Sequence, residues 1–84
     1  APFVDLYQLL EVSPASDVET LRKRIAQVYG EAQQNADHRN FRKRFYYQEL
    51  LEVYLPQARH LLLHPERRAE YDDQLRAFLE GKYD

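Results

Sequence analysis

The sequence predicts an all-α fold, and three observations lead to that prediction. Only two of the 84 residues are glycine, at Gly30 and Gly81, so positions that interrupt a helix are few. No alternating run of β-branched residues lies between turn residues, which is the pattern typical of strands. Apolar residues instead recur three and four positions apart, as they do along one face of an α-helix.

The first predicted helix is short and runs from Asp5 to about Leu10. Its apolar and aromatic residues are expected to pack against the rest of the chain, and they are Leu6, Tyr7, Leu9 and Leu10. Pro14 follows in the segment EVSPAS, where it ends the helical pattern.

The second predicted helix begins at a capping box and runs to about Gln34. Ser16 and Glu19 have the spacing at which each side chain bonds a free backbone N–H at the start of a helix. One apolar stripe follows with a three-four spacing: Val18, Leu21, Ile25, Val28, Tyr29 and Ala32. Three bases flank this stripe, namely Arg22, Lys23 and Arg24.

The third predicted helix runs from about Phe41 to Leu63 and is apolar on more than one face. Phe41 and Phe45 lie off its two apolar stripes, so one neighbouring helix cannot cover all of these residues. Pro56 has no N–H for the carbonyl of Glu52, which predicts a kink or a restart there. The two stripes are Leu51, Leu55, Ala58 and Leu62, and Tyr46, Leu50, Val53 and Leu61.

The fourth predicted helix has His64 as its capping residue and Pro65 as its first residue, a position that favours proline. Arg68 and Asp72 are four residues apart, a spacing at which an ion pair contributes about 0.3 kcal/mol. Gly81 is expected to end the helix. The residues expected to face inward are Tyr71, Leu75, Phe78 and Leu79.

Charge is distributed unevenly along the chain, although the formal net charge is only -2. Residues 1–37 carry six acids and three bases, and residues 49–84 carry eight acids and five bases. Between them, residues 38–48 carry four bases and no acid. The middle of the chain is therefore a basic segment within an acidic protein.

The length and composition predict one small globular domain over residues 1–84. No apolar run approaches the ~20 residues that span a bilayer, and the N-terminus lacks a signal-peptide pattern. With no cysteine, the chain has no disulfides or thiolate metal sites, and we expect a cytoplasmic or other reducing compartment. Because the chain begins at Ala1 and has no methionine, we expect it to be a fragment of a larger protein.

The sequence contains no convincing catalytic or cofactor-binding pattern. His60 and His64 have a spacing that could hold a metal, but no cysteine or third histidine lies nearby. No glycine-rich phosphate loop is present, and Ser13 and Ser16 are explained as turn and cap residues. We therefore expect no enzyme activity, no metal and no cofactor.

Two separated segments of this chain resemble the DnaJ-type J domain. The opening of that domain is similar to residues 5–23, DLYQLLEVSPASDVETLRK, and its close is similar to residues 57–72, QARHLLLHPERRAEYD. The resemblance covers residues 5–35 and 55–73 in the same order. It implies a four-helix arrangement with a long antiparallel hairpin of the second and third helices. Glu11 stands where the family usually has glycine, and His64 where it often has aspartate.

A third departure concerns the function that the resemblance implies. Gln33, Gln34 and Asn35 stand where the family carries His-Pro-Asp, its signature for stimulating ATP hydrolysis by a DnaK-type chaperone. The run of His64, Pro65 and Glu66 is a near-copy in another place. The resemblance therefore implies a J-like domain that does not stimulate the chaperone.

The third helix is predicted to be longer than the second, ~23 residues against ~18, or ~35 Å against ~27 Å. We expect the excess to form an overhang that carries Phe41, Phe45 and the basic cluster. Exposed aromatics and arginines are strong interface anchors, so the overhang is a candidate protein-binding surface. In the alternative without a binding role, the phenylalanines fold back onto the core and the bases are solvated.

Nucleic acid is a third interpretation of the basic-aromatic segment 38–47, which could grip phosphates and stack bases. An acidic domain with a pI near 5.9 is a poor electrostatic host for it. For Arg22, Lys23 and Arg24, the resemblance implies contact with an acidic partner, and the alternative is a solvated helix face with local ion pairs.

These observations favour a noncatalytic J-domain-like interaction module. Its partner is expected to be a DnaK-type chaperone, an authentic J protein or an unrelated protein. If the partner is a J protein, the resemblance implies that the module restrains it, as the J-like subunit of the mitochondrial import motor does. An unorthodox contact that still activates the chaperone is a further alternative. A weak homodimer through Tyr46, Leu50 and Val53 is also predicted. The predicted partner-binding residues are Arg22, Lys23, Arg24, Gln33, Gln34, Asn35, Arg39, Phe41, Arg42, Lys43, Arg44 and Phe45.

Overall fold

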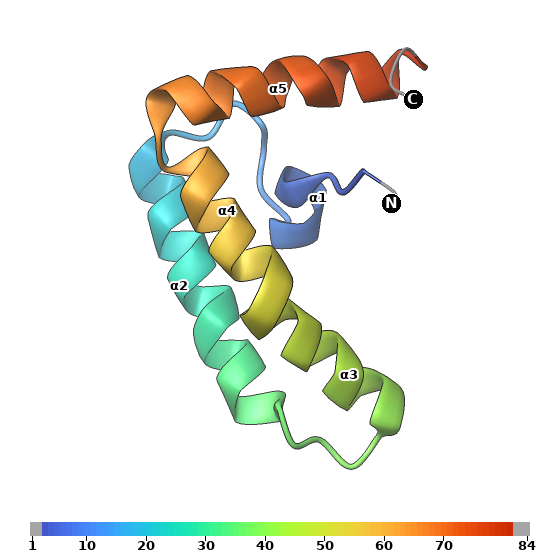
Figure 1. The fold of residues 1–84 in the computed structure, drawn as a ribbon. Coiled ribbons are helices and arrows are strands. Elements are labelled where there is room, and N and C mark those ends of the chain that lie inside the picture. Colours follow the sequence, from blue (N-terminus) through green and yellow to red (C-terminus); the bar gives the residue numbers. More distant parts are fainter. Residues whose placement is uncertain (1–2, 82–84) are drawn as a thin grey trace.

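A computed structural model describes residues 3–81 of the chain, and the all-α prediction is confirmed within that range. In Figure 1, α2 and the run from α3 to α4 lie side by side, α5 crosses one end of this pair, and α1 lies in the angle beneath α5. The elements are α1 Leu6–Leu10, α2 Val18–Asn35, α3 Phe41–Glu49, the π-helical η1 Leu50–Tyr54, α4 Leu55–Leu62 and α5 Pro65–Leu79.

The short helix α1 has caps at both ends. The Asp5 carboxylate accepts a hydrogen bond from the backbone N–H of Gln8 at 3.1 Å. Glu11 ends the helix in the left-handed region at a φ of 58°, and its N–H donates to the carbonyls of Gln8 and Tyr7. Five residues make too short a helix to be stable alone, so burial of its apolar side is what stabilises it.

The start of α2 corrects the predicted capping box. Asp17, and not Ser16, is the capping residue, and its carboxylate accepts from the N–H of Thr20 at 2.8 Å. This hydrogen bond lowers the pKa of Asp17, because it favours the charged carboxylate. The backbone carbonyl of Ser16 accepts instead from Arg68 at 2.6 Å, and Val18 at the helix start is partly exposed rather than buried in the predicted stripe.

The third predicted helix is continuous, but its predicted kink at Pro56 takes another form. A segment of five residues that precedes Leu55 and Pro56, Leu50–Tyr54, forms a π-helix. The N–H of Leu55 donates to the carbonyl of Leu50. We attribute this loosened stretch to Pro56, because proline cannot donate to the Glu52 carbonyl as a regular α-helix requires. We call the continuous run of α3, η1 and α4 the α3–α4 helix.

The core lies where α1, α2, α4 and α5 meet. Its buried residues are Leu6, Tyr7, Leu10, Leu21, Ile25, Val28, Ala32, Leu50, Leu55, Ala58, Leu62, Tyr71 and Leu75. None comes from α3. Leu79 was predicted to face inward but is 68 % exposed, because α5 extends beyond the other helices there. Phe78 is also partly exposed, although its ring stacks on Phe3 at 5.2 Å.

Two tyrosines fasten the N-terminal segment to α5. The Tyr71 hydroxyl donates to the carbonyl of Val4 at 2.6 Å and accepts from the N–H of Leu6 at 2.8 Å. The Tyr7 hydroxyl donates to the Asp72 carboxylate and accepts from the Arg68 guanidinium at 3.0 Å. We call Tyr7, Tyr71, Arg68 and Asp72 the tyrosine clamp.

Arg68 extends the clamp to the loop between α1 and α2. Its guanidinium donates to the carbonyls of Pro14 and Ser16, at 3.0 and 2.6 Å. The predicted pair with Asp72 is present but long, at 4.0 Å. The two loop bonds are therefore the closer contacts of this arginine, and they hold the start of α2 against α5.

No helix in the described range is long and apolar enough to cross a bilayer. Residues 3–81 also contain no group of three or more His, Cys, Asp or Glu side chains that could hold a metal ion. His64 instead caps α5, where its Nδ1 accepts from the N–H of Arg67 at 3.3 Å.

Candidate protein-interaction surface

The start of α3 is fixed by polar contacts in the loop that precedes it. The Asn40 side chain accepts from the N–H groups of Arg42 and Lys43 at 3.0 and 3.2 Å. His38 accepts from the N–H of Asn40 at 2.9 Å. Asparagine is a favoured capping residue, so this sequence begins the helix at Phe41.

Phe41 and Phe45 are exposed on the first turns of α3, at 68 % and 56 %. The alternative in which both rings pack into the core is therefore wrong. The Arg44 guanidinium lies 5.6 Å from the centroid of the Phe41 ring, a cation–π contact that leaves this ring otherwise accessible. We call Arg39, Phe41, Arg42, Lys43, Arg44 and Phe45 the α3 surface.

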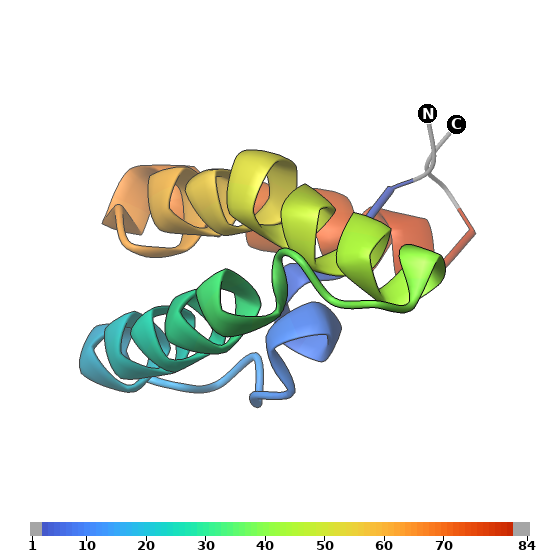
Figure 2. The same cartoon turned by 90° about the horizontal axis from the view of Figure 1, so that it is seen from below.

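The expected overhang differs in shape from the prediction. The α3–α4 helix bends at η1, so α3 turns away from α2 instead of running on beyond its end (Figures 1 and 2). Gln48 still ties α3 to α2, since its side-chain amide donates to the carbonyl of Ala36 at 2.9 Å. The α3 surface is therefore held apart from the core and remains attached to it.

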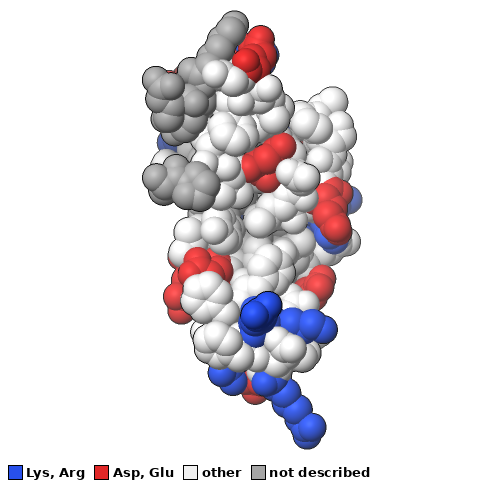
Figure 3. Space-filling model, turned by 90° about the vertical axis from the view of Figure 1, so that its right-hand side faces the viewer, with Lys and Arg blue, Asp and Glu red and all other residues white. Residues whose placement is uncertain are grey.

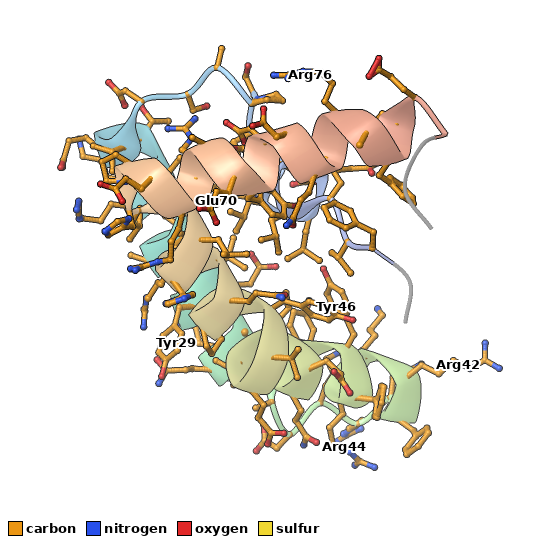
Figure 4. All side chains as sticks on the ribbon, turned by 45° about the horizontal axis from the view of Figure 1, so that its top comes forward. Tyr29, Arg42, Arg44, Tyr46, Glu70 and Arg76 are labelled. Carbon is orange, nitrogen blue, oxygen red and sulfur yellow. The ribbon has the colours of Figure 1, made fainter. Side chains whose placement is uncertain are left out.

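Positive charge gathers at this end of the molecule. Figure 3 shows lysine and arginine side chains gathered at its lower end, with a small acidic area among them, and larger acidic areas higher on the same face. Within residues 3–81, Arg39, Arg42 and Lys43 have no ion-pair partner within 4.0 Å. Figure 4 shows Arg42 and Arg44 extending from α3 away from the other helices. These charges are available to a partner.

The bases of α2 do not join this surface. Arg24 donates to the carbonyl of Leu10 at 2.6 Å and pairs with Glu11 at 3.2 Å, while Arg22 pairs with Glu19 at 3.1 Å. Arg22 and Arg24 therefore form local ion pairs, as the alternative to contact with an acidic partner predicted. Only Lys23 is exposed without such a pair, and it lies about 16 Å along α2 from Gln34.

The tripeptide position forms the last turn of α2, at the same end as the α3 surface. Gln33 and Gln34 are exposed, whereas Asn35 is half-buried. The side-chain amide of Asn35 donates to the carbonyl of Glu31 at 2.9 Å, and the backbone carbonyl of Asn35 accepts from the N–H of His38 at 3.1 Å. Asn35 thus closes α2, and only the two glutamines face solvent.

One feature that the sequence did not predict is a cleft of about 310 Å³ between α1, α2 and α3. Tyr46 stands at its edge, half-exposed, and burial of the phenol raises its pKa. Glu11 and Glu31 also line the cleft and come from other elements. Because they meet only in the tertiary fold, no sequence spacing could have grouped them.

No family model, curated protein or solved structure matches this chain. The likeness to the J domain rests on the two sequence segments quoted above.

Proposed function

We propose that this chain is a noncatalytic J-domain-like interaction module that docks a partner protein on the α3 surface. The observation that carries the proposal is the exposure of Phe41 and Phe45 beside three bases with no ion-pair partner in the described range. An exposed aromatic pair rimmed by arginines is the composition of interface hot spots.

The order of the helices supports the J-like part of the proposal. The segment that resembles the opening of a J domain runs through α1 into α2, and the closing segment runs from α4 into α5. Each motif therefore coincides with helices of the expected order. A hairpin of α2 with the α3–α4 helix is also what the resemblance implies.

The noncatalytic part rests on the residues at the tripeptide position. The chain has Gln33, Gln34 and Asn35 there, so the histidine and aspartate that define the family signature are missing. The displaced run that begins at His64 has a structural task, because His64 caps α5 and Pro65 is the first residue of that helix. It therefore offers no replacement for the tripeptide.

The chemistry of the α3 surface favours an acidic partner surface with apolar residues at its centre. Arginine side chains bind carboxylates in bidentate fashion, and the phenylalanines supply the desolvated contact area. Two kinds of partner fit: a DnaK-type chaperone or J protein that the module regulates, or an unrelated protein. Binding of nucleic acid by segment 38–47 is the second candidate, since the same bases could contact phosphates.

The test is single-turnover ATP hydrolysis by a DnaK-type chaperone, measured with the module alone and with an authentic J domain. We expect no stimulation by the module alone. Suppression of the authentic J domain would identify a regulator of the import-motor kind, and no effect in either arm would favour an unrelated partner. Stimulation by the module alone would overturn the proposal.

A matched pair of variants tests whether the α3 surface is responsible. Phe45→Ala should relieve any suppression, whereas Leu79→Ala, which removes a similarly exposed apolar side chain from α5, should not. Steeply salt-dependent binding to unspecific oligonucleotides, lost on Arg42→Ala, would favour the nucleic-acid alternative instead.

A further inference from the structure

The outer face of the α3–α4 helix is apolar well beyond the α3 surface. Of the seven large hydrophobic residues that are exposed within residues 3–81, four lie on this one helix: Tyr46 borders the cleft toward α1 and α2, and Phe41, Phe45 and Val53 do not line that cleft. Leu50, one of the three residues of the predicted homodimer interface, is 2 % exposed and cannot contribute to an interface in this conformation, and the homodimer itself stays a prediction. The exposed residues on either side of it remain.

The looser winding of the π-helical stretch returns Val53 toward the face of Phe45. Phe41, Phe45, Glu49 and Val53 are each four positions apart, and in a regular α-helix every such step advances by about 40° around the axis. The looser winding of η1, Leu50–Tyr54, turns the chain less per residue and reverses this drift before Val53. We call Phe41, Phe45 and Val53 the outer stripe; Glu49 lies between Phe45 and Val53 in the sequence.

The charge beside the outer stripe reverses along the helix. Arg42 and Lys43 stand at its start, and Glu49 and Glu52 stand two to three turns later. None of the four has an ion-pair partner within residues 3–81. Arg42 and Glu52 are ten residues apart, about 15 Å along the axis, so they cannot reach each other within one chain.

We propose that two copies of this chain pair through their outer stripes, with the α3–α4 helices antiparallel. With the two-fold axis near Tyr47, Arg42 of each copy faces Glu52 of the other. Phe41 then meets Val53 of the other copy, and Phe45 lies opposite Glu49, with the two Phe45 positions about 6 Å apart along the helices on either side of the axis. A two-fold interface makes every contact twice, so the pairs of Arg42 with Glu52 and of Phe41 with Val53 form at both ends of the outer stripe.

The charges select this occupant and this direction. A purely acidic partner would match Arg42 and Lys43 but would leave Glu49 and Glu52 opposite like charge. Parallel pairing of two copies would place bases against bases and acids against acids. Of these three arrangements, the antiparallel second copy is the one that meets both signs. The inference rests on the proposed function in that it uses the same exposed phenylalanines, so the dimer would have to dissociate before another protein docks there.

The experiment is sedimentation equilibrium of the unaltered chain, of two charge-reversal variants, of their mixture and of a control variant. We expect the unaltered chain to dimerise, and Arg42→Glu and Glu52→Arg each to weaken self-association at least tenfold, or about 1.4 kcal/mol. An equal mixture of the two variants should recover the dimer, because each charge then faces its opposite across the interface. This recovery also demonstrates that both variants are folded.

Two results would overturn the inference. A monomeric mass for the unaltered chain up to about 1 mM would show that the outer stripe does not self-associate. A mixture no more dimeric than the single variants would show that any dimer uses another face or direction. Lys23→Glu, a charge reversal at an exposed site on α2, is the control and should leave the dimer unchanged. ATPase stimulation by a monomeric or dimeric module would affect the proposed function alone.

Discussion

The two ends of this molecule use aromatic residues in opposite ways. At the α5 end, Tyr7 and Tyr71 are 1 % and 4 % exposed, and each hydroxyl both donates and accepts a hydrogen bond. At the α3 end, Phe41 and Phe45 are more than half exposed, and α3 contributes no buried residue. One end joins distant segments of the chain, while the other presents its side chains to solvent.

This difference separates stability from binding. The tyrosine clamp connects residues more than sixty positions apart, so it holds the fold together across the ends of the chain. The α3 surface is connected to α2 through local bonds and Gln48. Changes at the clamp should therefore alter the free energy of unfolding, and changes at the α3 surface should alter binding.

The largest expected effect is that of Tyr71→Ala. This substitution removes a buried ring that stacks on Phe3 at 5.5 Å, together with its bonds to Val4 and Leu6. The free energy of unfolding should fall by about 3–5 kcal/mol, most of the stability of a domain this small. Urea denaturation followed by circular dichroism measures it.

Tyr71→Phe separates the ring from its hydroxyl. The ring still fills its site, but the N–H of Leu6 and the carbonyl of Val4 lose their partner, at a cost of about 1–3 kcal/mol. A cost as large as that of the alanine variant would mean that the hydrogen bonds, and not the packing, hold the N-terminal segment.

Alkaline pH should weaken the same end of the molecule. Burial, the larger cause, raises the pKa of Tyr7 to about 12, with the hydrogen bond to Asp72 as a second cause, and burial raises the pKa of Tyr71 to about 12. The unfolded chain releases these protons near pH 10, so the folded state binds more protons between about pH 10 and 12. Stability should be undiminished below pH 10 and should fall across that interval by on the order of 2 kcal/mol for each tyrosine.

The measurement is the urea midpoint as a function of pH from 8 to 12. Tyr7→Phe removes one of the two clamp tyrosines whose pKa is raised to about 12, so the stability of this variant should fall by on the order of 2 kcal/mol less across the interval. A variant curve that falls as far as that of the unaltered chain would locate the pH sensitivity elsewhere.

Much of the fold was predictable because its signals are local. The three-four spacing in α2 identified the buried Leu21, Ile25 and Val28, and Pro65 marked the first residue of α5. The capping residue of α2 was misplaced by one position, because Ser16 and Asp17 are both good caps and the contact of Arg68 with the Ser16 carbonyl decides between them. That contact spans 52 residues and leaves no local pattern.

The candidate site was predictable in composition but not in arrangement. The basic run without acids and the surplus of apolar faces pointed to Phe41 and Phe45, and their exposure agrees with the partner-surface hypothesis. The spacing did not reveal that Arg24 is engaged by Leu10 and Glu11, since this depends on how α1 packs on α2. The sequence also predicted a kink at Pro56, whereas the structure has a five-residue π-helix, Leu50–Tyr54, before that proline. This π-helix changes which residues share the outer face of the α3–α4 helix.

The smallest expected effect on stability is that of Phe45→Ala, and it tests the comparison most directly. Because the ring is 56 % exposed, its removal should change the free energy of unfolding by less than about 1 kcal/mol. For a domain of this size, that is a shift of less than about 8 °C in the thermal midpoint. Melts should be run at low concentration, where self-association makes no contribution, with Leu79→Ala as the matched exposed control. A loss of about 3 kcal/mol or more would make Phe45 a core residue, and both ends of the molecule would then use their aromatics for stability.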